Sequence, residues 1–180
     1  MVDEKKKIIR QRIKELKNQL SNEEKIQKSH SIFQKIETTD WFIHAKTIML
    51  YWSMNDEVQT HDFVQKWADK KEIILPSVNG NELILKKFNG INKMVKGESF
   101  GIPEPDGELY PFPELIDVII VPGVAFDKQN NRLGRGKAFY DKLLKTVKSK
   151  KVGVCFDFQM IDQVPTGEFD IKMDCVVYDD

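Results

Sequence analysis

The sequence has few of the residues that usually mark a covalent framework or a metal centre. Only two cysteines, Cys155 and Cys175, occur among the 180 residues, and both lie in short apolar runs. Neither belongs to a Cys-x-x-Cys motif, and the three histidines are scattered. We therefore expect two reduced core thiols in a cytoplasmic protein, with no disulfide and no zinc site.

The sequence also lacks net charge and long apolar runs. Its 28 basic and 28 acidic residues cancel, so no global field favours nucleic acid as a partner. No apolar run approaches the ~18 residues that cross a bilayer, and the basic N-terminus has no apolar signal core. We expect one domain over residues 1–180, without a membrane span, a secretion signal or a linker.

Helices are predicted over residues 3–20, from Ser21 to about residue 37, from Thr60 to about residue 70, and from the end of a polar loop to about residue 148. Ser21 and Glu24 form a capping box, and Thr60 is expected to cap the third helix. The inward-facing stripes are expected at the following residues: Ile9, Ile13, Leu16 and Leu20; Ile26, His30, Phe33 and Ile36; Phe63, Val64 and Trp67; Phe139, Leu143, Leu144 and Val147.

Strands are predicted at residues 47–52, 72–75, 82–88, 116–121, 152–156 and 175–178, and Pro76 is expected to stop the second. The first two strands and the helix between them form a βαβ unit, which predicts a parallel pair. Glu57 follows the carboxyl end of a strand, where open parallel sheets bind ligands. A carboxylate at a helix N-terminus explains Glu57 equally well.

Residues 89–114 are rich in glycine and proline and form a long connection. Such long loops inside a compact domain are usually functional or disordered. Because this one carries Phe100, Tyr110 and Phe112, we expect it to pack against the body of the protein and to form a wall of the site.

The most informative stretch is VPGVAFDKQNNRLGRGKAFYD, residues 121–141. A strand leads into a loop with two glycines and three cations, and the loop ends at a helix. Glycines let backbone N–H groups approach a ligand, and a helix start points N–H groups at negative charge. The pattern therefore indicates an anion site that suits phosphate, although a solvated turn has the same composition.

The loop matches neither common phosphate motif. In the P-loop pattern, Asn131 stands where the first glycine belongs, and Ala138 stands where the magnesium-binding hydroxyl belongs. The dinucleotide fingerprint lacks its third glycine. Since no Ser-His-Asp set, Cys-His set or HExxH motif is present, the chemistry favoured is phosphoryl transfer by positioning and charge.

Several carboxylates and cations can complete such a site. Magnesium takes one or two carboxylates together with phosphate oxygens, and Asp141 and Asp170 can supply them; Asp127 stands at the start of the loop. Each aspartate can equally be a cap or turn residue. Lys6 and Arg10 share one helical face, which is also typical of a solvated surface.

Taken together, these motifs resemble the 5-formyltetrahydrofolate cyclo-ligase family over nearly the whole chain. NRLGRGKAFYD (residues 131–141) is similar to its nucleotide loop, Lys6-x-x-x-Arg10 to its ATP-contacting pair, and SMNDEVQT (residues 53–60) to its folate-contacting segment. LP (residues 75–76), IPEP (102–105), VPGVAFD (121–127), Gln159, and Val164-Pro165 followed by Asp170 occur in the family's order.

The resemblance implies an ATP- and Mg2+-dependent conversion of 5-formyltetrahydrofolate to 5,10-methenyltetrahydrofolate. ATP phosphorylates the formyl oxygen, N10 attacks the activated carbon, and phosphate and ADP are released. It also implies a three-layer α/β/α fold with a mainly parallel central sheet, similar to phosphosugar isomerases and CoA transferases. We expect a monomer whose substrate is a folate, with or without a polyglutamate tail.

The resemblance assigns roles to individual residues. Arg132, Arg135 and Lys137 are the expected catalytic cations, and Asp141 and Asp170 the expected magnesium ligands. Phe139 and Tyr140 either pack on the ligand or fill the core. The expected ATP-binding residues are Lys6, Arg10, Arg132, Leu133, Gly134, Arg135, Gly136, Lys137, Ala138, Phe139 and Tyr140, and the expected folate-binding residues are Trp52, Glu57, Arg135, Gly136, Lys137, Ala138 and Phe139.

The chain departs from the family pattern at three positions. Ala138 replaces a glycine, Phe139 a tyrosine, and Asn130 a glycine. Asn tolerates positive φ, but a Cβ at position 138 would cost about 1–2 kcal/mol if φ is positive there. We expect activity to survive with altered affinity.

Two other functions compete with this hypothesis. A sugar-phosphate isomerase of the same fold would use Glu57 or Asp127 as a base and need neither ATP nor magnesium. A nonenzymatic nucleotide- or RNA-binding module would use the basic helix and the Arg-Gly loop, but the neutral net charge and the few aromatic residues in that helix argue against it.

Overall fold

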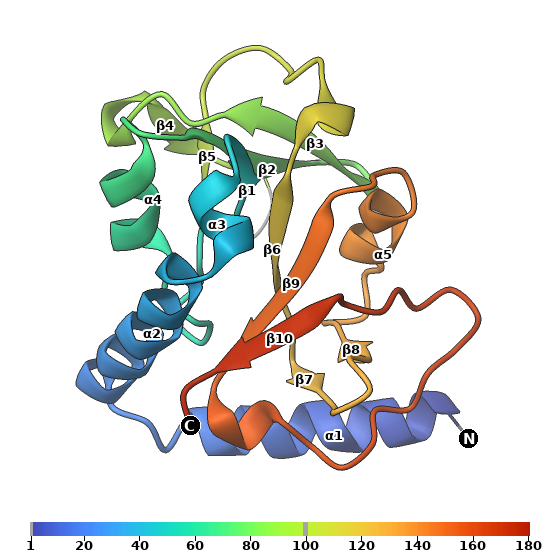
Figure 1. Ribbon diagram of the computed structural model, residues 1–180. Helices are drawn as coiled ribbons and strands as arrows, with labels where there is room; N and C mark the ends of the chain where they lie inside the picture. Colours follow the sequence, from blue (N-terminus) through green and yellow to red (C-terminus); the bar gives the residue numbers. More distant parts are fainter. Residues whose placement is uncertain (1, 99–100) are drawn as a thin grey trace.

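A six-stranded sheet forms the centre of the computed structural model, which describes residues 2–98 and 101–180 (Figure 1). Its strands follow the order β10 (Cys175–Tyr178), β9 (Lys150–Cys155), β6 (Val118–Pro122), β1 (Thr47–Met49), β2 (Glu72–Asn79) and β3 (Glu82–Lys87). Strands β2 and β3 are antiparallel, and the other neighbouring pairs are parallel. The mainly parallel sheet predicted from the sequence is confirmed.

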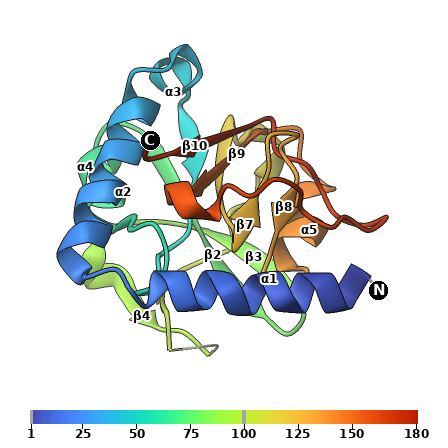
Figure 2. The same cartoon turned by 90° about the horizontal axis from the view of Figure 1, so that it is seen from below.

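Helices cover both faces of the sheet, so the three-layer prediction is also confirmed (Figures 1 and 2). Side chains alternate along a strand, and in β1 Ile48 faces one core while Met49 faces the other. The first core packs against α2 (Asn22–Glu37), α3 (Asp40–His44) and α4 (His61–Trp67), and the second against α5 (Phe139–Leu144).

Helix α1 (Val2–Lys17) lies across the carboxyl ends of the strands (Figure 2). Its stripe packs against a small hairpin of β7 (Ala125–Phe126) and β8 (Arg132–Leu133), where Ile13 is fully buried with Leu133. The hairpin lies within the stretch expected to be a polar loop, and it was not predicted. The contact places one face of α1 over the region where that loop emerges.

The predicted N-terminus of α2 is confirmed, but part of its stripe is wrong. Ser21 and Glu24 form the capping box, with the Glu24 N–H donating to Ser21 Oγ at 3.2 Å. Ile26 and His30 are exposed, whereas Ser29 is buried and accepts a hydrogen bond from the Gln59 N–H. The buried face thus begins with a polar residue, which a purely apolar pattern misses.

Two local expectations about α4 and β2 are wrong. Helix α4 begins after Thr60 as expected, but the Thr60 hydroxyl donates to Tyr51 O at 2.6 Å and does not cap the helix. Strand β2 continues through Pro76 to Asn79. Beyond Leu75 its hydrogen-bonded neighbour is β3 alone, so no strand on the other side requires the N–H that proline lacks.

The helix after the loop is shorter than expected, because α5 ends at Leu144. Leu144 and Val147 are buried as predicted, whereas Phe139 lines a cavity instead of the core. The chain ends with η3 (Asp157–Gln159), an irregular segment, and β10 at the predicted position. Cys155 and Cys175 lie on neighbouring strands, and both are free thiols.

The connection after β3 is ordered against the body where the structure describes it. It contains η1 (Ile91–Lys93), β4 (Met94–Lys96), β5 (Pro103–Pro105) and η2 (Pro113–Leu115). Glu104 accepts a hydrogen bond from the Val78 N–H at 3.1 Å, and both Glu104 and Ile102 line the cavity. The predicted wall is therefore present, while Phe100 lies outside the described residues.

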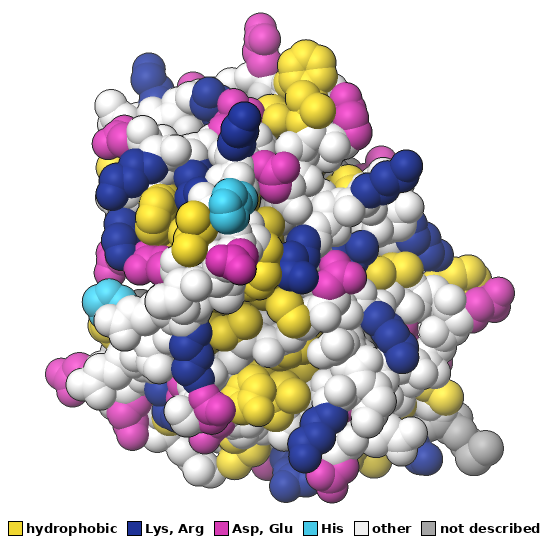
Figure 3. All heavy atoms as spheres, viewed as in Figure 1, with side chains coloured by type: hydrophobic (Ala, Val, Ile, Leu, Met, Phe, Trp, Pro, Cys, Tyr) yellow, Lys and Arg dark blue, Asp and Glu magenta, His cyan; other side chains and the backbone are white. Residues whose placement is uncertain are grey.

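Surface charge on the face shown in Figure 3 is mixed, with basic and acidic side chains interspersed, as the neutral composition predicts. Among residues 2–98 and 101–180, no helix is both long and apolar enough to cross a membrane.

Candidate active site

A cavity of about 450 Å3 lies beside α1, and its lining includes residues that follow the carboxyl ends of β1 and β6. All residues that the sequence analysis assigned to ATP, folate or magnesium line it, although they come from four separate segments. They are Lys6, Arg10, Trp52, Glu57, Arg132, Leu133, Gly134, Arg135, Gly136, Lys137, Ala138, Phe139, Tyr140, Asp141 and Asp170.

Asp127 closes the hairpin that precedes the loop. This fully buried carboxylate accepts hydrogen bonds from the N–H groups of Gln129 and Asn131 at 3.0 Å, the Asn131 amide at 2.9 Å, and the Val164 N–H at 2.9 Å. Burial opposes ionisation, but these bonds hold the pKa of Asp127 below its usual value. Because Asp127 points into the hairpin and does not line the cavity, it cannot be the base of the isomerase alternative.

Two backbone positions in the loop have positive φ. Gly136 has φ of 99°, and a Cβ there would meet the Arg10 guanidinium at 3.5 Å. Ala138 has φ of 55° and ψ of 15° at the N-cap of α5, so the glycine of the family pattern is replaced where φ is positive. Asn130 also has positive φ, at 63°, as its side chain tolerates.

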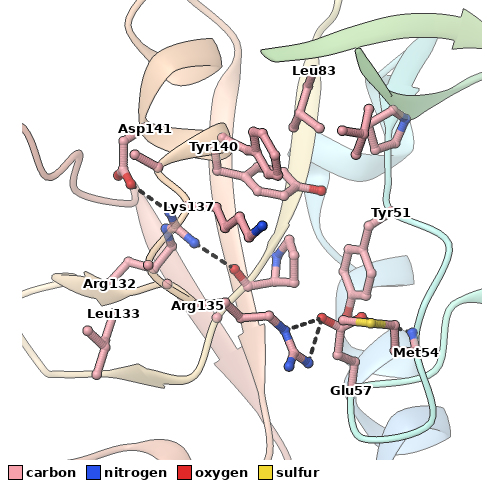
Figure 4. Close-up of a pocket in the computed structure, with 18 of the residues that line it drawn as sticks. Tyr51, Met54, Glu57, Leu83, Arg132, Leu133, Arg135, Lys137, Tyr140 and Asp141 are labelled. Carbon is pink, nitrogen blue, oxygen red and sulfur yellow. Dashed lines mark hydrogen bonds and ion pairs between the residues drawn. The ribbon is translucent and has the colours of Figure 1, made fainter. Parts of the chain in front are cut away.

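Arg132 is buried beneath the loop instead of projecting into the cavity. Its Nη1 donates to Pro122 O at 3.0 Å and its Nη2 to Asp141 Oδ2 at 3.1 Å (Figure 4). A Cβ on Gly134 would lie 3.0 Å from Nη1. Arg132 therefore joins the end of β6 to the start of α5 and packs closely under the backbone of the loop.

Helix α1 reaches the site through two cations. Lys6 Nζ lies 2.5 Å from Asp170 Oδ2, which also accepts the Gly167 N–H at 2.8 Å. Burial opposes ionisation, but Lys6 and this N–H lower the pKa of Asp170 below its usual value. Arg10 Nε donates to Gly134 O at 2.9 Å. The two contacts hold the loop that is expected to bind phosphate together with the segment that contains Asp170.

Arg135 faces the opposite wall of the cavity. Its Nη2 lies 3.2 Å and its Nε 3.4 Å from Glu57 Oε1 (Figure 4). Glu57 Oε2 accepts the Met54 N–H at 2.9 Å. Burial raises the pKa of Glu57, and the Met54 N–H and Arg135 offset only part of that effect. The structure thus joins the basic loop directly to the acidic residue after β1.

The remaining walls are flat and apolar. Trp52 stacks on His61, with ring centroids 4.0 Å apart and planes 14° apart. Tyr51 and Tyr140 are largely enclosed, and burial raises the pKa of both phenols, so both stay neutral near pH 7. An apolar, aromatic-walled cavity with a few charged groups is typical of a site for a planar organic ligand.

Sequence reasoning missed part of this wall. Tyr51 and Met54 flank the carboxyl end of β1, a position that could have indicated them. Val78 and Leu83 belong to the β2–β3 hairpin, which was hidden by the expectation that Pro76 ends the strand. Pro76 and Asp3 also line the cavity, whereas Ile102 and Glu104 belong to the wall that was predicted within residues 89–114.

Asp141 and Asp170 lie on adjoining parts of the cavity wall. The N–H of Ile171, the residue after Asp170, donates to Asp141 Oδ1 at 3.2 Å. Within the described parts of the chain, no group of three or more His, Cys, Asp or Glu side chains is placed to hold a metal ion. Two carboxylates suit magnesium, which completes its shell with phosphate oxygens and water.

Comparison with known proteins gives a consistent family. A model described as the 5-formyltetrahydrofolate cyclo-ligase family matches residues 2–179. The chain is 31% identical to the 5-formyltetrahydrofolate cyclo-ligase of Haemophilus influenzae, over 96% of this chain and 97% of that protein. It is 29% identical to a probable 5-formyltetrahydrofolate cyclo-ligase of Caenorhabditis elegans, over 99% of this chain and 94% of that protein.

Solved structures of similar fold point to the same family. The 5,10-methenyltetrahydrofolate synthetase of Aquifex aeolicus superposes with a TM-score of 0.86 at 38% identity, covering 96% of this chain and 88% of that chain. The synthetase of Mycoplasma pneumoniae gives a TM-score of 0.78 at 26% identity, covering 97% of this chain and 99% of that one.

Proposed function

Because this chain belongs to the 5-formyltetrahydrofolate cyclo-ligase family, it converts 5-formyltetrahydrofolate to 5,10-methenyltetrahydrofolate, and we propose that the cavity beside α1 binds the folate together with ATP. The observation that carries this proposal is the position of Arg135. Arg135 belongs to the loop that is expected to bind phosphate, and it contacts Glu57, the residue expected to bind folate.

The proposed reaction begins with transfer of the γ-phosphoryl group of ATP to the formyl oxygen. The N10 nitrogen of the folate then attacks the activated formyl carbon, the ring closes, and the phosphate leaves with the former formyl oxygen. Arg135 and Lys137 line the cavity and can balance charge on the transferring group, while backbone N–H groups of residues 134–136 can hold its oxygens.

Arg132 contributes indirectly in this proposal. Its guanidinium is bound to Pro122 O and Asp141, so it holds the loop in shape instead of reaching into the cavity. Lys6 and Arg10 bring positive charge from α1 toward the phosphates of ATP. Lys6, Arg10, Arg135 and Lys137 all line the cavity, and this positive charge suits a triphosphate.

The folate is proposed to lie on the other side of the cavity. Glu57 can accept hydrogen bonds from the paired N–H groups of a pterin, because an ionised carboxylate retains lone pairs beyond those used by Met54 and Arg135. Trp52 and Tyr140 provide flat walls for the ring. Enclosure of the reacting groups strengthens each electrostatic contact by lowering the local dielectric constant.

Magnesium is proposed to bind through Asp141 and Asp170, where it would neutralise phosphate charge. We expect Asp141→Asn and Asp170→Asn to raise the magnesium concentration needed for half-maximal rate by about tenfold or more. Asp162→Asn is the matched control, since Asp162 is exposed and lies outside the cavity. An unchanged magnesium requirement in both site variants would remove these residues as ligands.

Binding measurements test the two sides of the cavity separately. Arg135→Ala should weaken binding of a non-hydrolysable ATP analogue more than binding of 5-formyltetrahydrofolate, and Glu57→Ala should do the reverse. Calorimetry measures both affinities without turnover. Equal losses for both ligands in both variants would contradict this division of roles.

We also propose that residues 1–180 act as one cyclo-ligase domain, as a cytoplasmic monomer that accepts folates with or without a polyglutamate tail. The match of the family over residues 2–179 supports a single functional unit. Light scattering after size-exclusion chromatography tests the monomer, and a mass of two or more chains would contradict it.

A further inference from the structure

We infer that Asp56, supported by Lys17, is a positioning residue that keeps Glu57 available to folate by binding the guanidinium of Arg135. The inference rests on the proposed binding of folate by Glu57. Asp56 and Lys17 are absent from the cavity lining, so they act through Arg135 and not by touching a ligand.

Arg135 is shared unequally between two neighbouring carboxylates. Its Nη2 lies 2.7 and 2.9 Å from the two oxygens of Asp56, but 3.2 Å from Glu57 Oε1. Its Nε is 3.4 Å from the same Glu57 oxygen. The shorter contacts are therefore those to Asp56, and the contacts to Glu57 are near the limit of a hydrogen bond.

Lys17 is the second cation that contacts Asp56. It is the last residue of α1 and is only 4% exposed, and its Nζ lies 3.6 Å from Asp56 Oδ2. A buried ammonium group is costly unless a carboxylate accompanies it. The four side chains form a cluster of two cations and two carboxylates, in which Asp56 is the residue that contacts both cations.

The arrangement has a consequence for Glu57. Burial opposes the charge of Asp56, but Lys17 and Arg135 lower its pKa, so Asp56 is ionised and competes for the guanidinium. Without that charge, the guanidinium can pair fully with Glu57, which it already contacts through two nitrogens. A folate would then have to displace Arg135 before it could use the Glu57 carboxylate.

The test is calorimetric binding of 5-formyltetrahydrofolate without ATP, which excludes turnover. Asp56→Asn keeps the shape of the side chain and removes its charge, and we expect it to weaken folate binding about fivefold. Asp56→Glu, which keeps the charge, should restore most of the affinity. Asp69→Asn is the control for loss of a carboxylate, because Asp69 is exposed and outside this cluster. Thermal unfolding of each variant shows that the comparison is made on folded protein.

A double variant separates positioning from a structural effect. In an Arg135→Ala background, Asp56→Asn should change folate affinity less than twofold, since the competing guanidinium is gone. No loss of affinity from Asp56→Asn alone would overturn the inference, and so would an equal loss in both backgrounds. If the wild-type protein does not bind 5-formyltetrahydrofolate, the proposed function fails first, and the inference fails with it.

Discussion

Ala138 is a non-glycine residue with a positive φ, 55°, at the start of α5. The resemblance found in the sequence predicted that a glycine is usual at this position. A Cβ in the left-handed region costs about 1–2 kcal/mol. The departure therefore leaves local strain beside the loop proposed to bind phosphate.

Replacing Ala138 with glycine should stabilise the protein. Relief of the strain outweighs the added freedom of glycine in the unfolded chain, so the free energy of unfolding should rise by roughly 0.5–1 kcal/mol. Ala68→Gly is the matched control, because Ala68 has φ of −58°. That change should lower stability by a similar amount. Urea unfolding measures both, and destabilisation by Ala138→Gly would contradict the backbone assignment.

Glu57 should give folate binding a dependence on acidity. Its pKa is raised above the ordinary 4.5, mainly by burial, so the carboxylate becomes protonated at a higher pH than an exposed one. As the pH falls from neutrality toward the ordinary pKa of 4.5, affinity for 5-formyltetrahydrofolate should fall because Glu57 loses its charge. Glu57→Gln should bind weakly with a much smaller pH dependence, and calorimetry at several pH values tests this. The same pH profile in both proteins would show that Glu57 is not the group that titrates.

The raised pKa of Glu57 should affect stability in the opposite direction, so that the folded protein becomes less stable as pH rises. The folded state holds its proton more tightly than the unfolded state, so this stabilising contribution is complete below about pH 4.5 and is lost as pH rises through the folded pKa. Wild type should therefore lose stability relative to Glu57→Gln, which cannot ionise at this position, as pH rises through that window. Urea unfolding at each pH measures the difference, and a gain of wild-type stability relative to the variant as pH rises would contradict the burial argument.

Among the elements next to the candidate site, the β7–β8 hairpin was not predicted from the sequence. Its strands are two residues each, too short for an alternating pattern to be recognised. Its turn is held by hydrogen bonds to one buried carboxylate, Asp127, which the sequence showed only as another acidic residue of the loop. The helices and strands with longer apolar patterns were predicted at nearly their observed positions, because those patterns report a buried face directly.

Asp127→Ala should destabilise the protein by about 3 kcal/mol or more, since it leaves several buried donors without an acceptor. The catalytic rate per folded molecule should fall only slightly, because Asp127 does not line the cavity. Urea unfolding and turnover of the folded fraction measure the two effects, and Asp127→Asn offers a milder variant if the first does not fold. A large loss of turnover with unchanged stability would indicate a chemical role instead.

The errors at α2 and β2 have physical causes that a single sequence does not show. Ser29 is buried because its hydroxyl bonds to neighbouring backbone groups, which depends on residue 59 lying beside the helix. Pro76 is tolerated because β2 has a partner on only one side at that point. Both depend on tertiary neighbours. The residues expected at the site, in contrast, all line one cavity, because the fold brings together the four segments on which the family resemblance placed them.

At the scale of the whole molecule, α1 is the element that joins the parts of the cavity. It contacts the Asp170 segment through Lys6, the loop through Arg10, and the segment after β1 through Lys17. The helix is held by Ile13, which is 1% exposed and packs against the hairpin. Its packing should therefore influence ligand binding, although Ile13 is not itself part of the cavity lining.

Ile13→Ala should lower the free energy of unfolding by about 3 kcal/mol and should also weaken binding of a non-hydrolysable ATP analogue. The cause is looser packing of the helix that carries Lys6 and Arg10. Ile26→Ala on α2 is the matched control, since Ile26 is 47% exposed and should change neither quantity appreciably. Unfolding and calorimetry at a temperature where both variants are folded test this. Unchanged nucleotide affinity in Ile13→Ala would show that α1 contributes its cations without being held rigidly.

The central claim is that one cavity brings ATP and 5-formyltetrahydrofolate together for ring closure. The most direct measurement is the absorbance of the methenyl product after the protein is mixed with 5-formyltetrahydrofolate, magnesium and ATP. We predict a rise that requires ATP, is reduced when magnesium is removed by a chelator, and is nearly abolished in Arg135→Ala. Product formation that proceeds equally without ATP, or no product at all with the folded wild-type protein, would contradict the account.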